Sequence, residues 1–303
     1  MLEILKTVQA ELLRLKGEGV DSVSVDDESM AILRKLIAKN SAQAPKSAKN
    51  EYVEEVHFAQ NVDLGKAVST EKPVKVKTVK DFNIKPIPSP TPFEVKGNTK
   101  AEKWECLKNI VLNDKVCLEH VHEGKNLVFG VGSIDSPVFF CGEAPGADEE
   151  TQGEPFVGRA GQLLTKIIKA MGLDRKDVYI GNIMNWRPEL PTLTGNRPPD
   201  EVEMAYCLPF LKAQIEIVNP KVIVALGKTA AVGLLGANNV KSLGAVRGRW
   251  HNYMDRKLMI TYHPSYLLQY ATPKTKRTVW EDMMLVMEEL GIPISEKQRG
   301  YFL

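Results

Sequence analysis

Four side chains that could carry chemistry lie at the ends of apolar, strand-like segments or in the loops beside them. They are the carboxylate of Glu143, the ring of Phe156, the amide of Asn182 and the imidazole of His263. In an open α/β sheet, ligands bind in the crevice at the carboxyl ends of the strands, so these groups are expected to meet there. An acid, an aromatic ring, an amide and an imidazole around one crevice are typical of a pocket for a flat polar ring.

The loop GEAPG at 142–146 follows the apolar segment VFFC and forms the lip of this predicted pocket. Its glycines let the backbone approach a ligand and leave amide N–H groups free to point at it. Gly142 and Ala144 are therefore predicted to contact the ring together with Glu143. The alternative for Glu143 is a solvated loop acid. The acids at 148–150 are interpreted as solvent-facing or helix-starting residues.

Three of the groups could act on a nucleobase. Phe156, in the polar loop EPFVGRAG, could stack on a base turned out of DNA, an interaction of roughly 1–3 kcal/mol, or could instead cover the helix start. The Asn182 amide can donate to O4 and accept from N3–H of uracil, whereas cytosine presents the reverse pattern; the alternative is an Asn that caps a turn. His263 could donate to the oxyanion that develops on a leaving base, or could be a structural hydrogen-bonding residue.

Residues that could hold DNA are predicted at the same edge of the sheet. The net charge of +2 is nearly neutral, so any affinity for DNA must come from a local basic face. Side chains that could contact phosphates or wedge into the base stack are Arg187, Arg247, Arg249, Ser265, Tyr266, Leu267 and Lys276. The alternatives are ordinary solvated charges, and leucines that begin the packing of the next segment.

The elements that must position these residues alternate along the chain. Apolar segments predict strands at 127–131, 138–142, 178–182, 222–226 and 257–261, and helices are predicted at about 160–171, 200–218, 227–235 and 277–290. This alternation predicts a three-layer α/β/α sandwich around a mainly parallel sheet. No apolar run approaches the ~20 residues of a membrane span, and the N-terminus does not have the pattern of a secretory signal, so a cytoplasmic protein is expected.

The first hundred residues have a different character. Leucine and isoleucine at helical spacing predict short helices within 1–40, and an Ala, Ser, Lys and Pro-rich composition predicts a flexible linker at 41–99. The folded domain is assigned to 100–303. The hypothesis for the N-terminal arm is that it docks a protein partner, and the alternative is a loosely packed tail. Deletion of residues 1–95 is expected to leave the activity of the domain largely intact.

Three motifs together resemble the uracil-DNA glycosylase superfamily, and most closely its family-four branch. They are GEAPGADEETQGEPFVGRAGQLL, YIGNIMNWRPE and YHPSYLL, and the resemblance covers about residues 103–290. It implies an α/β/α sandwich and hydrolysis of the bond between uracil and deoxyribose. A monomer is expected. By this resemblance Phe156 stacks on the extruded uracil, Asn182 reads its edge, His263 stabilises charge on O2, and Glu143 with nearby backbone places the water.

Family-four enzymes usually bind a four-iron cluster through four cysteines, and here the chain departs from the pattern. Trp186 stands where a cysteine is expected, and Cys117 is followed by His120 rather than by a second cysteine of a C-x-x-C pair. Only Cys207 stands at an expected ligand position, so no cluster or other metal is predicted. The alternatives to uracil excision are excision of another base such as hypoxanthine, xanthine or thymine, and a DNA-binding protein that lacks the chemistry.

Overall fold

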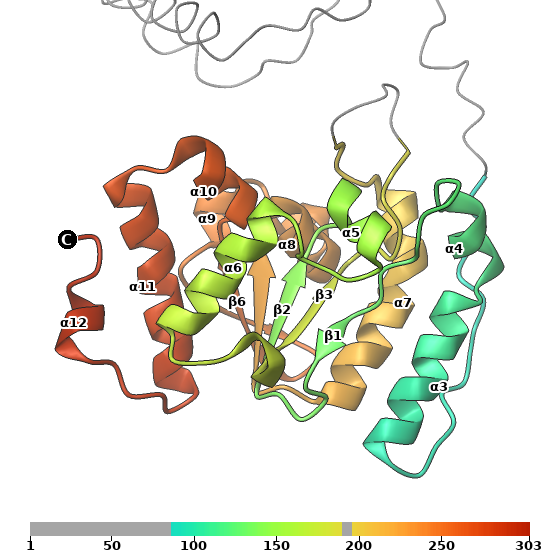
Figure 1. Cartoon of the computed structure of the whole chain (residues 1–303), viewed down its shortest axis with the longest axis horizontal. Coiled ribbons are helices and arrows are strands. Elements are labelled where there is room, and N and C mark those ends of the chain that lie inside the picture. Colours follow the sequence, from blue (N-terminus) through green and yellow to red (C-terminus); the bar gives the residue numbers. More distant parts are fainter. Residues whose placement is uncertain (1–85, 190–195) are drawn as a thin grey trace, which may run out of the picture. The chain divides into compact units, whose positions relative to one another are not determined.

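The computed structural model describes residues 86–189 and 196–303 (Figure 1). The helices predicted within 1–40 and most of the predicted linker lie outside these residues. Within them the chain forms one sheet with helices on both of its faces. The predicted α/β/α sandwich is therefore confirmed for this part of the chain.

Six strands form the sheet of the described residues, in the order β1-β3-β2-β4-β6-β5. They are β1 (Val131–Gly132), β2 (Val138–Gly142), β3 (Tyr179–Asn182), β4 (Val222–Leu226), β5 (Trp250–Tyr253) and β6 (Arg256–Thr261). The four inner strands are parallel, and β1 and β5 are antiparallel at the two edges. Gly142 pairs with Asn182 and Leu226 with Thr261, so the loops that follow these strands begin side by side.

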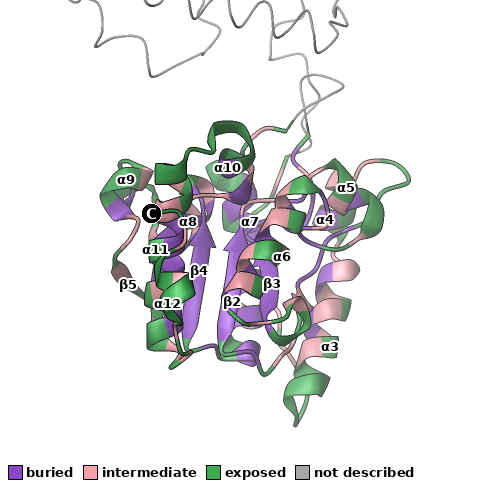
Figure 2. Ribbon diagram, turned by 60° about the vertical axis from the view of Figure 1, so that its left-hand side comes forward, coloured by how far each residue is buried: buried purple, intermediate pink, exposed green. Residues whose placement is uncertain are grey.

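Helices cover the two faces because the strand side chains alternate and are apolar on both sides. Phe139 and Cys141 belong to the core beneath α3 (Lys100–Leu112), α7 (Glu201–Val218) and α8 (Lys228–Leu235). Val138 and Phe140 belong to the core beneath α6 (Arg159–Ala170) and α11 (Pro273–Glu289). Figure 2 shows the buried strands between these two helical layers. The shorter helices are α4 (Lys115–His120), α5 (Ala147–Gln152), η3 (Arg175–Asp177), η4 (Ala237–Asn239), α9 (Leu243–Val246), α10 (Pro264–Tyr270) and α12 (Glu296–Arg299).

Several predicted elements differ from the observed ones at the edges of the sheet. The strand predicted at 127–131 enters the ladder only at β1, and the edge strand β5 was not predicted, because its sequence WHNY lacks an apolar run. The last long helix begins at Pro273 rather than at residue 277. Thr272 caps this helix by accepting from the N–H of Thr275, and proline is favoured at the first helical position.

The end of the segment predicted as a linker packs onto the domain. Residues 86–98 form no helix or strand, and Ile87, Phe93 and Val95 pack against the core. The rings of Phe93 and Phe210 lie 5.1 Å apart between their centroids. A deletion meant to test the N-terminal arm should therefore end before residue 86 rather than at residue 95. Of the described residues, no helix has both the length and the hydropathy that a membrane crossing requires.

Candidate active site

The predicted pocket residues meet in a cavity of about 310 Å³ at the carboxyl ends of the parallel strands. The cavity is lined by five residues that the sequence predicted to contact the base or the reacting bond, namely Glu143, Ala144, Phe156, Asn182 and His263. Ser265 lines it as well. A larger hollow of about 660 Å³ lies between α6, α10 and α11 and is mainly apolar. It contains none of these five side chains, so the smaller and more polar cavity is the candidate active site.

Gly142 allows the ring of Phe156 and the amide of Asn182 to approach one another. A Cβ atom at Gly142 would lie 2.4 Å from Oδ1 of Asn182 and 2.5 Å from Cε2 and Cζ of Phe156. Both side chains are only 6% exposed. Oδ1 of Asn182 is buried and accepts no hydrogen bond within the described residues. Because buried polar atoms are normally satisfied, this oxygen is suited to accept an N–H from a ligand.

The backbone at Phe156 is held in an unusual conformation. Its φ of 55° lies in the left-handed region, which costs a non-glycine residue of order 1–3 kcal/mol unless the surroundings fix it. The carboxylate of Glu149 helps to hold the loop of Phe156 in this conformation. Its Oε1 accepts from the N–H groups of Val157 and Gly158, each at 3.0 Å, and its Oε2 accepts from Gly146 at 3.1 Å. Glu149 thus joins the lip of the pocket to the loop of Phe156, and its interpretation as a solvent-facing or helix-starting residue was incomplete.

Replacement of Glu149 with alanine should lower kcat for the chemistry of this pocket by about tenfold. The loop would lose three hydrogen bonds, and a misplacement of about 1 Å in an active site can cost as much as 10²-fold. Glu149→Gln keeps one acceptor oxygen and should retain more activity than Glu149→Ala. Exposed Glu154 in the same loop provides the matched control, Glu154→Ala. Equal rates for Glu149→Ala and Glu154→Ala in steady-state assays would contradict this role.

His263 is the N-cap of α10 and faces the cavity. Its Nδ1 accepts from the backbone N–H of Ser265 at 3.2 Å, and Oγ of Ser265 lies 2.8 Å from the same nitrogen. A nitrogen that accepts a hydrogen bond carries no proton, so the neutral ring has its proton on Nε2. The ring centroid lies 5.6 Å from that of Phe156. His263 can therefore donate from Nε2 to a ligand that lies against Phe156.

Burial lowers the pKa of His263 to about 4, so the ring stays neutral at ordinary pH. An unfolded histidine has a pKa near 6.5, so between about pH 6.5 and 4 the unfolded chain binds a proton that the folded chain does not. The stability that this residue contributes is complete above pH 6.5 and is lost as the pH falls toward 4. His263→Gln should therefore lose less free energy of unfolding than the wild type between pH 7.5 and 5. Urea titrations at both values test this, and equal losses in the two proteins would contradict it.

Glu143 lies in the cavity beside the first turn of α8. Burial raises the pKa of Glu143, and a hydrogen bond from the Thr229 side chain lowers it. Thr229 was not predicted from the sequence, although it follows Gly227 at the end of β4, the same kind of strand end as the other site residues. Lys228, Asn196 and Arg197 also line the cavity without having been assigned to it.

The sequence of this chain is similar to those of known proteins over the part that forms the cavity. The model of the uracil DNA glycosylase superfamily matches residues 129–284, which is just over half of the chain. The chain belongs to the uracil DNA glycosylase superfamily. It is 42% identical over 186 residues to a protein of Thermotoga maritima named type-4 uracil-DNA glycosylase, which covers 61% of this chain and 93% of that protein. A protein of the same name from Saccharolobus solfataricus is 39% identical over 174 residues, 55% of this chain and 77% of that protein.

The residues present do not fit the cluster that the family-four branch of this superfamily usually carries. Cys117 and Cys207 are buried, and their thiols interact. Trp186 is buried and packs against residues near these cysteines in the sequence, with its ring centroid 5.2 Å from that of His120 and 6.2 Å from that of Tyr206. A hydrogen bond with Cys207 and burial raise the pKa of Cys117 far above its ordinary value, which disfavours the thiolate that binds metal. The described part of the chain has no group of three or more His, Cys, Asp or Glu side chains placed to hold a metal ion.

The basic residues that were predicted from the sequence to contact DNA divide into two sets. Arg187 and Arg247 already bind buried carboxylates, Glu150 at 2.8 Å and Asp282 at 2.6 Å. Arg249 and Lys276 are exposed. Leu267 is only 6% exposed and lines the apolar hollow, so it packs between helices rather than projecting as a wedge. That DNA contacts any of these residues stays a prediction, as it does for Ser265 and Tyr266.

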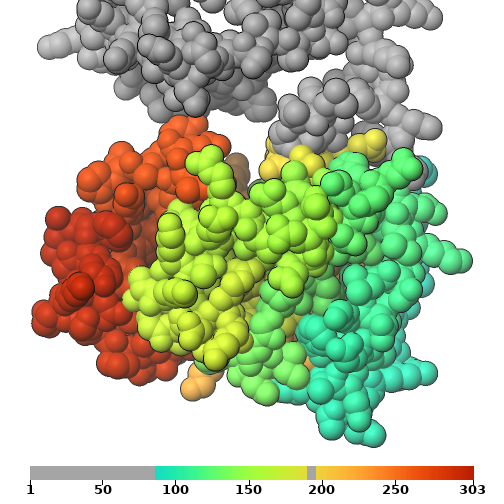
Figure 3. Space-filling view, viewed as in Figure 1, coloured from blue at the N-terminus to red at the C-terminus, as the bar shows by residue number. Residues whose placement is uncertain are grey.

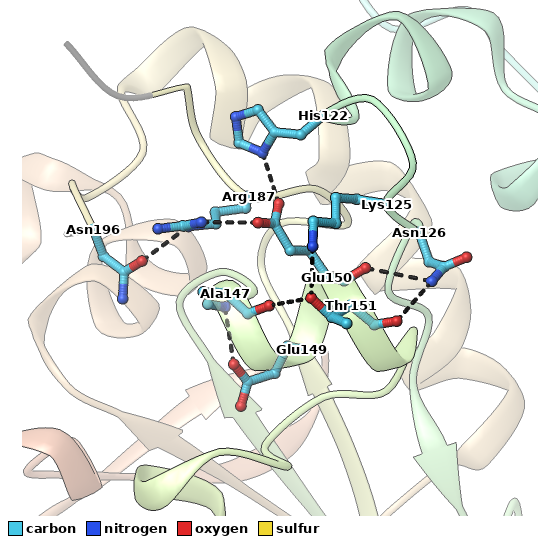
Figure 4. A network of polar contacts seen from close by, with 10 residues as sticks. His122, Lys125, Asn126, Ala147, Glu149, Glu150, Thr151, Arg187 and Asn196 are labelled. Atoms are coloured by element: carbon cyan, nitrogen blue, oxygen red, sulfur yellow. Dashed lines mark hydrogen bonds and ion pairs between the residues drawn. The ribbon is translucent and has the colours of Figure 1, made fainter. Parts of the chain in front are cut away.

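Figure 4 shows the polar network around Glu150. Its carboxylate accepts from Nδ1 of His122 at 2.6 Å and from Nη1 of Arg187 at 2.8 Å, while Nε of Arg187 donates to Oδ1 of Asn196 at 3.0 Å. Burial alone would raise the pKa of Glu150, but these two hydrogen bonds hold it below its ordinary value. The network therefore fixes Asn196, which lines the cavity, through a carboxylate of α5 that does not itself line it.

Proposed function

We propose that the protein is a uracil-DNA glycosylase, which hydrolyses the bond between uracil and deoxyribose in single- and double-stranded DNA and leaves an abasic site. The observation that carries this proposal is the buried, unpartnered Oδ1 of Asn182 beside the ring of Phe156. An acceptor oxygen and a donor NH₂ on one amide match N3–H and O4 of uracil. Membership of the superfamily and the names of its relatives support the same substrate.

Each pocket residue has a role that follows from its position. Phe156 stacks on the extruded uracil and Asn182 binds its edge. When the bond between the sugar and the base breaks, its electron pair goes to the uracil, and Nε2–H of His263 stabilises the charge that develops on O2. Glu143, with the backbone of Gly142 and Ala144, orients the water that adds to C1′ of the sugar.

A release assay tests the proposal directly. A single-stranded oligonucleotide with one uracil is incubated with the full-length protein and then cleaved by alkali at abasic sites. We expect cleavage by the wild type and a sharp loss in Asn182→Ala, with uracil opposite guanine and in single strands cut faster than uracil opposite adenine, because extrusion is easier there. Parallel oligonucleotides with hypoxanthine or xanthine test the alternative bases. No release of uracil, with binding retained, would overturn the proposal.

We further propose that the enzyme works without an iron–sulfur cluster. Two thiols cannot supply the four thiolates of such a cluster, and Trp186 and His120, whose rings lie 5.2 Å apart, stand at the sequence positions where the resemblance expects the other two cysteines. The purified protein is expected to contain no stoichiometric iron by elemental analysis and to lack a visible iron–sulfur absorption band. Stoichiometric iron, or such a band, would show that another set of ligands exists.

The cellular setting is also a proposal. We propose a cytoplasmic monomer whose substrate is uracil-containing DNA, with a protein partner for the arm at 1–40. Deletion of residues 1–85 keeps the packing of Phe93 on Phe210 and should leave uracil release from short oligonucleotides unchanged. A folded but inactive truncation would show that the arm takes part in excision.

A further inference from the structure

Three tyrosines form a continuous row that runs from the loop before α10 onto the helix. Tyr266 and Tyr270 are four residues apart on α10, so their side chains lie on one side of the helix, and Tyr262 lies in the loop that precedes it. The rings of Tyr262 and Tyr266 are stacked, with centroids 4.8 Å apart and planes 12° apart. The centroids of Tyr266 and Tyr270 are 5.1 Å apart. Tyr270 is 59% exposed and Tyr266 40%, so the outer end of the row is open to solvent.

The inner end of the row is anchored in the domain. The guanidinium of Arg247 lies over the ring of Tyr262, 5.4 Å from its centroid. Arg247 is itself fixed by Asp282, which is buried, and by the carbonyl of Thr278. The row therefore has an arginine and two stacked rings as its base, and the third ring, that of Tyr270, is tilted by 41° against Tyr266 and is the most exposed of the three.

The surroundings of the row favour a polyanion. The row begins beside His263, whose ring lines the cavity, and α10 lies at the end of the sheet toward which the parallel strands point (Figure 2). The first turn of α11, which follows α10 after two residues, contains no acid, and Lys274 and Lys276 there are exposed. On the surface, α6, α10 and α11 lie against one another (Figure 3).

We propose that this row binds single-stranded DNA next to the extruded nucleotide, with a base stacked on the open side of Tyr270 and phosphates near Lys274 and Lys276. Aromatic side chains bind single strands by stacking on successive bases, whatever their sequence. The bases of an intact duplex are already covered on both sides, so the row adds affinity for single strands and for opened DNA. This inference rests on the proposed function, because it takes DNA as the substrate.

Binding of full-length protein to a single-stranded oligonucleotide without uracil tests the row. Tyr270→Ala should weaken the Kd about tenfold, as expected for one lost base stack, while Tyr270→Phe should bind like the wild type. Tyr270→Ala should leave the slope of log Kd against log salt unchanged, whereas Lys274→Ala should reduce it, because only the lysine releases a counterion. Leu118→Ala is the matched control, since Leu118 is 51% exposed on α4, far along the chain from the row.

Three results would overturn the proposal: an unchanged Kd in Tyr270→Ala, an equal loss in Tyr270→Phe, or an equal loss on uracil-free duplex DNA. The assay needs no base release, so failure of this inference and failure of the proposed function can be told apart. A wild type that binds the oligonucleotide through Tyr270 but releases no uracil would refute the glycosylase and keep the row.

Discussion

His263→Ala should lower kcat for uracil release by about 10²–10³-fold, the usual cost of one donor to a developing oxyanion. The structure supports a rate effect of this magnitude, because Nδ1 of His263 accepts a hydrogen bond from Ser265 and the proton of the neutral ring is therefore on Nε2. Because burial lowers the pKa of His263 to about 4, the donor is a neutral imidazole throughout the neutral range. The effect should therefore be the same at pH 6 and pH 8. Single-turnover release of uracil at saturating enzyme measures it without interference from product release.

Ser265→Ala tests how much the Ser265 hydroxyl, which lies beside Nδ1 of His263, contributes to the action of the donor Nε2–H of His263. This variant keeps the backbone N–H that binds Nδ1 but removes the hydroxyl 2.8 Å from the ring, so it should cost only a few-fold in rate. Asn182→Ala is expected to raise KM as well, because its amide binds uracil before the bond breaks. A His263→Ala protein that is folded by circular dichroism and retains a third or more of the wild-type rate would remove His263 from the chemistry.

The strand ends were the part of the site that the sequence could predict. Segments such as VFFCG and VIVALG are apolar, short and closed by glycine, which identifies central strands, and parallel strands bring their carboxyl ends to one edge. Glu143, Asn182 and His263 all follow such ends, so their convergence was predictable before any contact was known. Phe156 is different, because it lies in a loop between helices. The sequence indicated it only as a lone aromatic residue in a polar loop, with a ring that covers the helix start as the alternative.

The contacts that hold the site were not predictable, because each depends on partners distant in the sequence. Glu149 reads as one acid in a run of three, and only the fold brings the amides of Val157 and Gly158 to its carboxylate. Arg187 and Arg247 read as a basic face, yet their partners are acids 37 and 35 residues away. The tyrosine row could have been found from its four-residue spacing, but α10 itself was not predicted, since its leucines were interpreted as a wedge.

The expected effect of Gly142→Ala is the strictest test of the pocket. One added carbon would lie 2.4–2.5 Å from both Asn182 and Phe156, closer than real Cβ contacts allow, so one of the two uracil-binding side chains must move. We expect a loss of at least about 10²-fold in kcat/KM, since displacements near 1 Å at a reacting centre have that cost. The φ angle of Gly142 is not positive, so the backbone at this position can accept alanine without strain. The loss in kcat/KM should therefore be larger than a change in the free energy of unfolding would explain.

Gly244→Ala is the matched control, because a Cβ atom there would meet no atom within 4 Å. Uracil release and the midpoint of thermal unfolding should both remain at the wild-type value in this variant. In Gly142→Ala the midpoint should fall modestly while release is nearly abolished, because the clash involves two side chains that bind the substrate. If Gly142→Ala released uracil at the rate of Gly244→Ala, Phe156 and Asn182 would not form the two walls of one uracil site, and the assignment of this cavity would fail.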